Sequence, residues 1–186
     1  MVSLVSLLIP ILGSAVLVFL ASFVIHMVLK YHWSDVATVP NEDRVMDALR
    51  SFNIPPGDYV IPHVSTPKEM KDPAFVEKRN RGPIAILTVV RPGPISMGKN
   101  LTQWFIYCVV IALFAAYVAS RTLAPGSPYL SVFRVTGTVA FIGFAGGLWQ
   151  NSIWWQRKWS ATIKSTIDGL IYALLVAGMF GSMWPE

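Results

Sequence analysis

Four long stretches of apolar residues account for most of the chain. In each stretch the apolar residues are nearly continuous, instead of recurring every third or fourth position as they do on a surface helix of a soluble protein. Each has about the 20 residues that a helix needs to cross the hydrocarbon layer of a membrane. The pattern predicts an all-α membrane protein, a four-helix transmembrane bundle, with its helices within Val2–Leu29, Leu101–Ser120, Tyr129–Gln150 and Ile163–Trp184.

The segment between the first two predicted helices has a different character. Trp33–Gly98 contains nine of the chain's thirteen prolines, so it cannot form one long helix. We therefore expect three parts along the chain. Residues 1–32 form transmembrane helix one, residues 33–98 form a Pro-rich cytoplasmic insertion, and residues 99–186 form transmembrane helices two to four.

Short elements are predicted inside the insertion. Asn41–Phe52 has the apolar periodicity of an amphipathic helix, with Asn41 placed to cap its beginning. Thr66–Glu69 matches a capping box, which marks a helix start. Ile84–Val90 is rich in β-branched residues and predicts a strand, paired with Tyr59–Ile61.

Composition and charge placement agree with a membrane protein. Of the 186 residues, 54% are hydrophobic and only 13% are charged, against about 25% charged in a soluble domain. The net charge of +5 arises from Lys and Arg residues between helices one and two and between helices three and four. Basic residues near helix ends favour the cytoplasmic side, so both termini are expected outside the cytoplasm. This explains the basic charge without a nucleic-acid partner. The basic residues that count most for this orientation, because they lie nearest to the helix ends, are Lys30, Arg81, Arg91, Lys99, Arg157, Lys158 and Lys164.

Motifs for catalysis, metals and cofactors do not stand out. Cys108 is the only cysteine, and His26, His32 and His63 lack the spacing of metal ligands. No serine has the context of a nucleophile. We therefore predict no catalytic residue, no metal site and no cofactor, and thus a protein that is not an enzyme.

One segment imitates a phosphate-binding loop. Gly93–Asn100 has the spacing of glycine, four residues, glycine and lysine. Pro92 and Pro94, however, remove backbone N–H donors, and Asn100 replaces the hydroxyl residue that would bind magnesium. A turn leading into helix two explains the segment better.

Polar residues near the cytoplasmic ends of the predicted helices are the candidates for function, because charge is costly in lipid. His26 and Asp168 lie at similar depth, and Lys164 lies one turn before Asp168. Gln103 and Asn151 belong to the same layer. We hypothesise a polar cluster with His26 and Asp168 as its charged pair. The alternative is that each residue is solvated separately at a helix end.

Small residues recur at four-residue spacing and predict close helix packing. They place helices two, three and four in a tight bundle, unless the row on helix four faces another protein. The proposed packing positions are Gly143, Gly147, Gly169, Ala173, Ala177 and Gly181.

The stretch Gly137–Pro185 carries a Gly-rich helix, then Asn151–Trp154, a basic and aromatic turn, and Asp168–Tyr172. In these features the chain resembles a family of small four-helix bacterial integral membrane proteins of unknown function. The resemblance implies the inner membrane of a bacterium and assigns no site residue.

These observations favour a non-catalytic membrane protein, either a structural or assembly subunit of a complex or a self-associating bundle. Its expected partners are the lipid bilayer and either other membrane subunits or a second copy. The alternative function is a small transporter or channel with a polar site at the cytoplasmic ends of the helices.

Overall fold

The computed structural model describes residues 2–186 and divides the chain into two compact units. Met1–Ala37 and Ser96–Glu186 form unit 1, and Thr38–Ile95 form unit 2. Unit 1 contains the long apolar helices, and unit 2 contains short helices and two strands.

Unit 1 contains four helical segments that are long and apolar enough to cross a membrane, as predicted: Val5–Leu29, Met97–Thr122, Tyr129–Ile153 and Trp159–Ser182. In the first, a 3₁₀ turn (Val5–Leu7) leads into α1 (Leu8–Phe23), which is followed by a π-helical turn (Val24–Leu29). The second is α4 (Met97–Thr122) and the fourth is α7 (Trp159–Ser182). Both of these helices begin four residues earlier than predicted, because a helix continues readily into polar residues that remain exposed.

The third segment is interrupted near its end. α5 (Tyr129–Ala145) stops before Gly146 and Gly147, and a short helix, α6 (Trp149–Ile153), follows the turn. Glycine is a poor helix former, so two in succession explain the break. The predicted helix to Gln150 is therefore α5 together with the beginning of α6.

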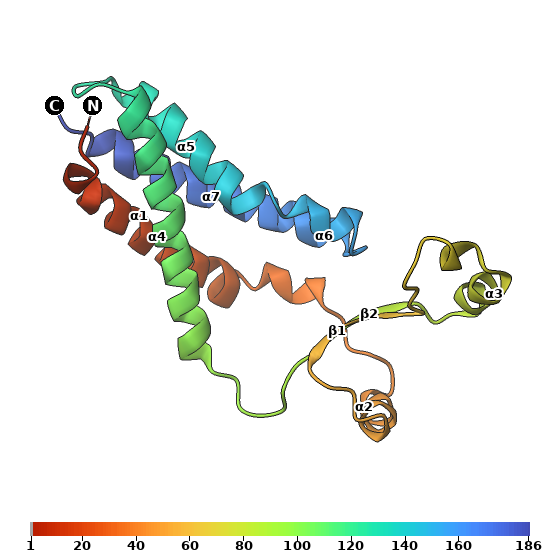
Figure 1. Ribbon diagram of the computed structural model, residues 1–186. Helices are drawn as coiled ribbons and strands as arrows, with labels where there is room; N and C mark the ends of the chain where they lie inside the picture. The colour runs from red at the N-terminus through yellow and green to blue at the C-terminus, as the bar shows by residue number, and fades with distance from the viewer. Residues whose placement is uncertain (1) are drawn as a thin grey trace. The chain divides into compact units, whose positions relative to one another are not determined.

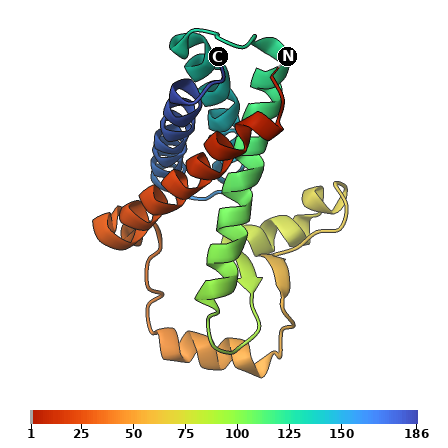
Figure 2. The same cartoon turned by 90° about the vertical axis from the view of Figure 1, so that its left-hand side faces the viewer.

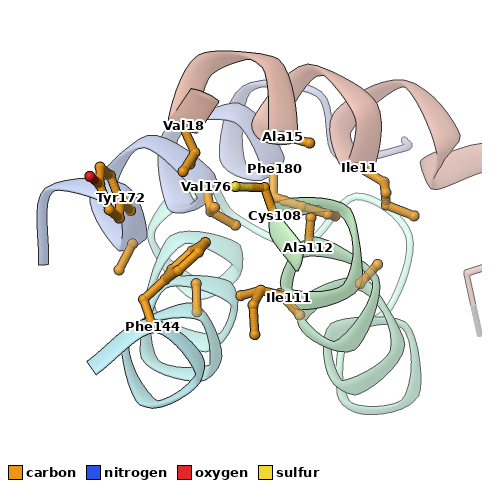
Figure 3. Packing of buried hydrophobic residues seen from close by; sticks show 14 of the residues in the cluster. Ile11, Ala15, Val18, Cys108, Ile111, Ala112, Phe144, Tyr172, Val176 and Phe180 are labelled. Atoms are coloured by element: carbon orange, nitrogen blue, oxygen red, sulfur yellow. The ribbon is translucent and has the colours of Figure 1, made fainter. Parts of the chain in front are cut away.

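The four helices of unit 1 pack as a closed ring. The neighbouring pairs are α1 with α4, α4 with α5, α5 with α7, and α7 with α1. Both views of the ribbon show α1 and α4 crossing one another (Figures 1 and 2). Buried side chains from all four helices meet in the centre, among them Ala15, Cys108, Phe144 and Phe180 (Figure 3). Helix one is thus part of the bundle together with helices two to four.

Small residues allow α5 and α7 to lie close together. A Cβ atom added to Gly169 would come 2.9 Å from the Cβ of Ala145, and one added to Gly137 would come 3.0 Å from the Cβ of Ala177. Ala173 and Ala177 are buried. The row of small residues on helix four therefore faces helix three of the same chain.

The other three glycines proposed for helix packing have different surroundings. A Cβ on Gly143 would meet the end of the Ile111 side chain, and one on Gly181 would meet the ring of Tyr129. No atom of the described residues lies within 4 Å of the position of a Cβ on Gly147. No close helix contact therefore depends on Gly147, because it belongs to the turn between α5 and α6.

Unit 2 is built around a two-stranded antiparallel sheet. β1 (Gly57–Ile61) pairs with β2 (Ala85–Val89), with Tyr59 opposite Leu87, which confirms the predicted pairing. α2 (Glu42–Ser51) precedes β1 and confirms the predicted amphipathic helix. Two strands alone form a marginal sheet in water.

Two helix-start predictions in unit 2 need correction. Asn41 precedes α2, but its backbone is left-handed (φ of 53°) and its side chain forms no capping hydrogen bond. The predicted capping-box contacts of Thr66 and Glu69 are present, since the N–H of Glu69 donates to Oγ1 of Thr66 at 3.4 Å and the Thr66 hydroxyl donates to the Glu69 carboxylate at 2.9 Å. Only a 3₁₀ turn (Glu69–Lys71) follows them, however, and α3 (Pro73–Arg81) begins later. Its cap is Asp72, which accepts a 2.8 Å hydrogen bond from the N–H of Ala74.

Candidate site at one end of the bundle

The site lies where the first apolar helix ends, at the end of unit 1 opposite the two termini (Figure 1). The π-helical turn Val24–Leu29 stops at Lys30, whose backbone is left-handed with a φ of 55°. Such a conformation is uncommon for a residue other than glycine. A 3₁₀ helix (Tyr31–Asp35) follows. As a result, the rings of His26 and His32 lie 4.7 Å apart between centroids.

His32 lies between two carboxylates. Its Nδ1 is 2.7 Å from Oδ2 of Asp35, and its Nε2 is 2.7 Å from Oδ2 of Asp168. Each ring nitrogen of His32 is therefore within hydrogen-bonding distance of a carboxylate oxygen.

Asp168 is the most enclosed member of the group. Its side chain is only 5% exposed, in the third turn of α7. Besides its contact with His32, it accepts a hydrogen bond at Oδ1 from the hydroxyl of Tyr31. Both carboxylate oxygens therefore have partners from the segment that follows helix one, and a buried carboxylate needs such partners.

Lys164, one helical turn before Asp168, holds the same segment by a second set of bonds. Its Nζ donates to the carbonyl of Tyr31 at 2.8 Å, to Oγ of Ser34 at 2.8 Å and to Oδ1 of Asp35 at 2.7 Å. The hydrogen bond from Lys164, with a smaller one from His32, holds the pKa of the Asp35 carboxyl below its ordinary value, although burial acts in the opposite direction. His32 and Lys164 thus alternate with the carboxylates of Asp35 and Asp168 across the site.

The structure brings three of the five residues of the hypothesised cluster together: His26, Lys164 and Asp168. The direct partner of Asp168 is His32, whereas His26 contributes a ring contact to His32. Within residues 2–186, the side chains of Gln103 and Asn151 form no hydrogen bond to this group. Gln103 is exposed on α4, and Asn151 is in the short helix α6.

Sequence reasoning missed Tyr31, His32 and Asp35. The spacing of His32 and Asp35, three residues apart directly after an apolar helix, was the available signal. The predicted boundary between helix one and the insertion separates His32 from Asp35, because nothing in the sequence indicates the left-handed backbone of Lys30 or the 3₁₀ helix that follows it.

The site can act chemically in two ways. Its alternating charges can hold the end of helix one against α7, or its donor atoms can bind a cation. One nitrogen of His26, one of His32 and a carboxylate oxygen of Asp168 all lie within 4.8 Å of one another. The sequence predicts no metal site, whereas the structure brings together three side chains of the types that bind metal ions.

Comparisons with known proteins assign no family to the chain. No protein-family model, no curated protein and no solved structure matches it. The resemblance of Gly137–Pro185 to small bacterial membrane proteins gains no support from these comparisons, so functional conclusions rest on the geometry of the two units.

Proposed function

We propose that the chain is a multi-pass protein of the cytoplasmic membrane of a bacterium, with both termini outside the cytoplasm. The four apolar helices support membrane insertion, because their outward faces carry large exposed apolar residues such as Leu20 (55% exposed) and Phe114 (59% exposed). In water these faces would be a large unfavourable surface, whereas lipid covers them at no cost. The basic residues between helices one and two and between helices three and four support the orientation.

We further propose a non-catalytic role, as a structural or assembly component of a membrane complex. The partner is a second membrane protein that contacts unit 2 through an apolar segment. The observation that carries this proposal is an apolar groove in unit 2, between α2 and the sheet. Its volume is about 530 Å³, and its lining includes Met46, Leu49, Ile54, Leu87 and Val89.

The groove favours a partner because it is apolar and uncovered within unit 2. Met46 is 52% exposed and Leu49 is 39% exposed, although both belong to the apolar face of an amphipathic helix. The small residues of α7, by contrast, are used in packing against α5. Contacts to another protein are therefore expected at unit 2 more than along α7.

The test is native mass spectrometry of the full chain, extracted from its own membranes in a mild detergent. A partner present at fixed stoichiometry is expected, and Met46→Glu should remove it. Met70→Glu is the matched control, since Met70 is similarly exposed (57%) in unit 2 but does not line the groove. A wild-type chain that is always monomeric, or equal partner loss in both variants, would refute the role.

The second candidate is a small transporter or channel with its polar site at the cytoplasmic ends of the helices. The enclosed carboxylate of Asp168 within an apolar segment favours it, because such charges often mark ion pathways. The mutual hydrogen bonds of the site argue the other way, since they leave few groups for a substrate. Reaction of Asp168→Cys with a water-soluble maleimide in intact membranes would support a water-filled path.

A further inference from the structure

We propose that His26, His32 and Asp168 form a binding site for a divalent transition-metal ion, with Zn²⁺ as the preferred ion. Two imidazoles and one carboxylate are ligands that such ions take readily in proteins. The site goes beyond the proposed role in a complex, and its test is independent of any partner.

The separations suit a metal ion. Ligand atoms at about 2.0–2.2 Å from a tetrahedral Zn²⁺ lie about 3.3–3.6 Å apart. The three candidate atoms lie within 4.8 Å of one another, and Nε2 of His32 is 2.7 Å from Asp168. Small rotations of the three side chains, without movement of the helices, therefore bring them to coordinating distances.

The surroundings of His32 orient it for ligation. Asp35 accepts a hydrogen bond from Nδ1 of His32, and this contact leaves Nε2 directed toward Asp168. A carboxylate on the far nitrogen of a ligating histidine fixes the ring and raises its basicity. Lys164 fixes Asp35 in turn, at 2.7 Å, and it forms no hydrogen bond to Asp168 within the described chain. Asp168 thus has no lysine partner, and its contacts with the Tyr31 hydroxyl and Nε2 of His32 are the ones that a bound cation would rearrange.

His26 is a free ligand in this arrangement. Its ring contacts His32, and its nitrogens form no hydrogen bond among residues 2–186. The π-helical turn that carries it and the left-handed Lys30 bring the two imidazoles together. Local strain of this kind persists only where surrounding contacts maintain it. Two adjacent imidazoles beside a carboxylate are stabilised when they share a cation.

Metal binding has a clear proton balance here. A proton held between Nε2 of His32 and Asp168 is released to water when the nitrogen coordinates the ion. The proton on Nδ1 stays on the ring and is donated in the hydrogen bond to Asp35. Three protein ligands leave one coordination position open for water or for a further group. Nearby, the buried hydroxyl of Tyr172, one helical turn beyond Asp168, has no hydrogen-bond partner in the described chain.

The experiment is a titration of the full-length chain, purified in mild detergent and freed of metal with a chelator. Zn²⁺ is added in a competition assay, and Co²⁺ is added to observe the absorption bands of tetrahedral coordination. One ion per chain is expected. His26→Ala should weaken Zn²⁺ binding by at least about 100-fold, and Asp35→Asn by about 10- to 100-fold.

His63→Ala, which removes a histidine of unit 2, is the matched control and should bind as the wild type does. His26→Ala is the decisive variant, because His26 forms no hydrogen bond with any residue that the structure describes, so its loss should leave the fold intact. Equal Zn²⁺ affinity in the wild type and His26→Ala would overturn the site. So would weak binding that only His63→Ala removes, since it would locate the ion elsewhere.

Discussion

Nε2 of His32 lies 2.7 Å from Oδ2 of Asp168, although 136 residues separate the two in the chain. This contact joins the segment after helix one to the last helix of the bundle. Around it, Tyr31 donates to the same carboxylate and Lys164 binds the same segment through Asp35. The connection is therefore a network of polar contacts at one end of an otherwise apolar bundle.

Because His32 and Asp168 interact directly, their substitutions should not be additive. We expect His32→Ala and Asp168→Asn to show a coupling energy of about 1–3 kcal/mol in a double-mutant cycle of unfolding. The measurement is chemical unfolding in detergent, with a parallel cycle for His63→Ala and Asp168→Asn as control. Additive effects in the first cycle would show that the contact contributes nothing.

Lys164 should hold the segment Tyr31–Asp35 in place. Lys164→Met removes three hydrogen bonds from a charged donor and should cost about 2 kcal/mol of local stability. Hydrogen exchange of peptides that cover residues 31–36 should accelerate. Lys158→Met, an exposed lysine at the beginning of the same helix, should leave exchange unchanged. The same acceleration in both variants would mean that the loss of surface charge is the cause.

Close packing of α5 and α7 predicts a size limit at Gly169. An added methyl group would come 2.9 Å from the Cβ of Ala145 and 3.5 Å from its backbone, so Gly169→Ala should destabilise the bundle by about 1–3 kcal/mol. Gly178→Ala in the same helix has space and should be neutral or slightly stabilising. Thermal unfolding in detergent compares the two. If Gly169→Ala were neutral, α5 and α7 would not pack this closely at Gly169.

The turn before α3 should depend on pH. The N–H of Ser65 and the hydroxyl of Thr66 donate to Glu69 and lower the pKa of its carboxyl from its ordinary value of 4.5. A lowered folded pKa contributes stability above the unfolded value, and this contribution is lost as the pH falls through the folded value. The amide resonance of Ser65 should therefore shift below pH 4.5. In Glu69→Gln this shift should disappear; an unchanged acid response would assign it to another group.

The apolar pattern predicted the helices well, because helix length and hydrophobicity are local properties. The strand pair Tyr59–Ile61 with Ile84–Val90 was also within reach, since β-branched residues and turns mark both strands. Helix ends were less predictable. Asn41 has the side chain of a cap, yet its backbone is left-handed and the side chain forms no capping hydrogen bond.

The candidate site was only partly predictable. His26, Lys164 and Asp168 stand out because ionisable groups within apolar segments are costly. Their partners Tyr31, His32 and Asp35 depend on a change of helical winding and a left-handed Lys30. Such a turn results from the long-range contacts with α7, and the local sequence contains no signal for it.

The proposed topology underlies the rest of the account, and cysteine labelling tests it most directly. In a Cys108→Ser background, Ala124→Cys lies in the exposed turn between α4 and α5, and Lys71→Cys lies in unit 2. A membrane-impermeant maleimide applied to intact cells should label Ala124→Cys at once and Lys71→Cys only after lysis. Labelling of Lys71→Cys in intact cells, or recovery of the unlabelled chain in the supernatant without detergent, would contradict the account.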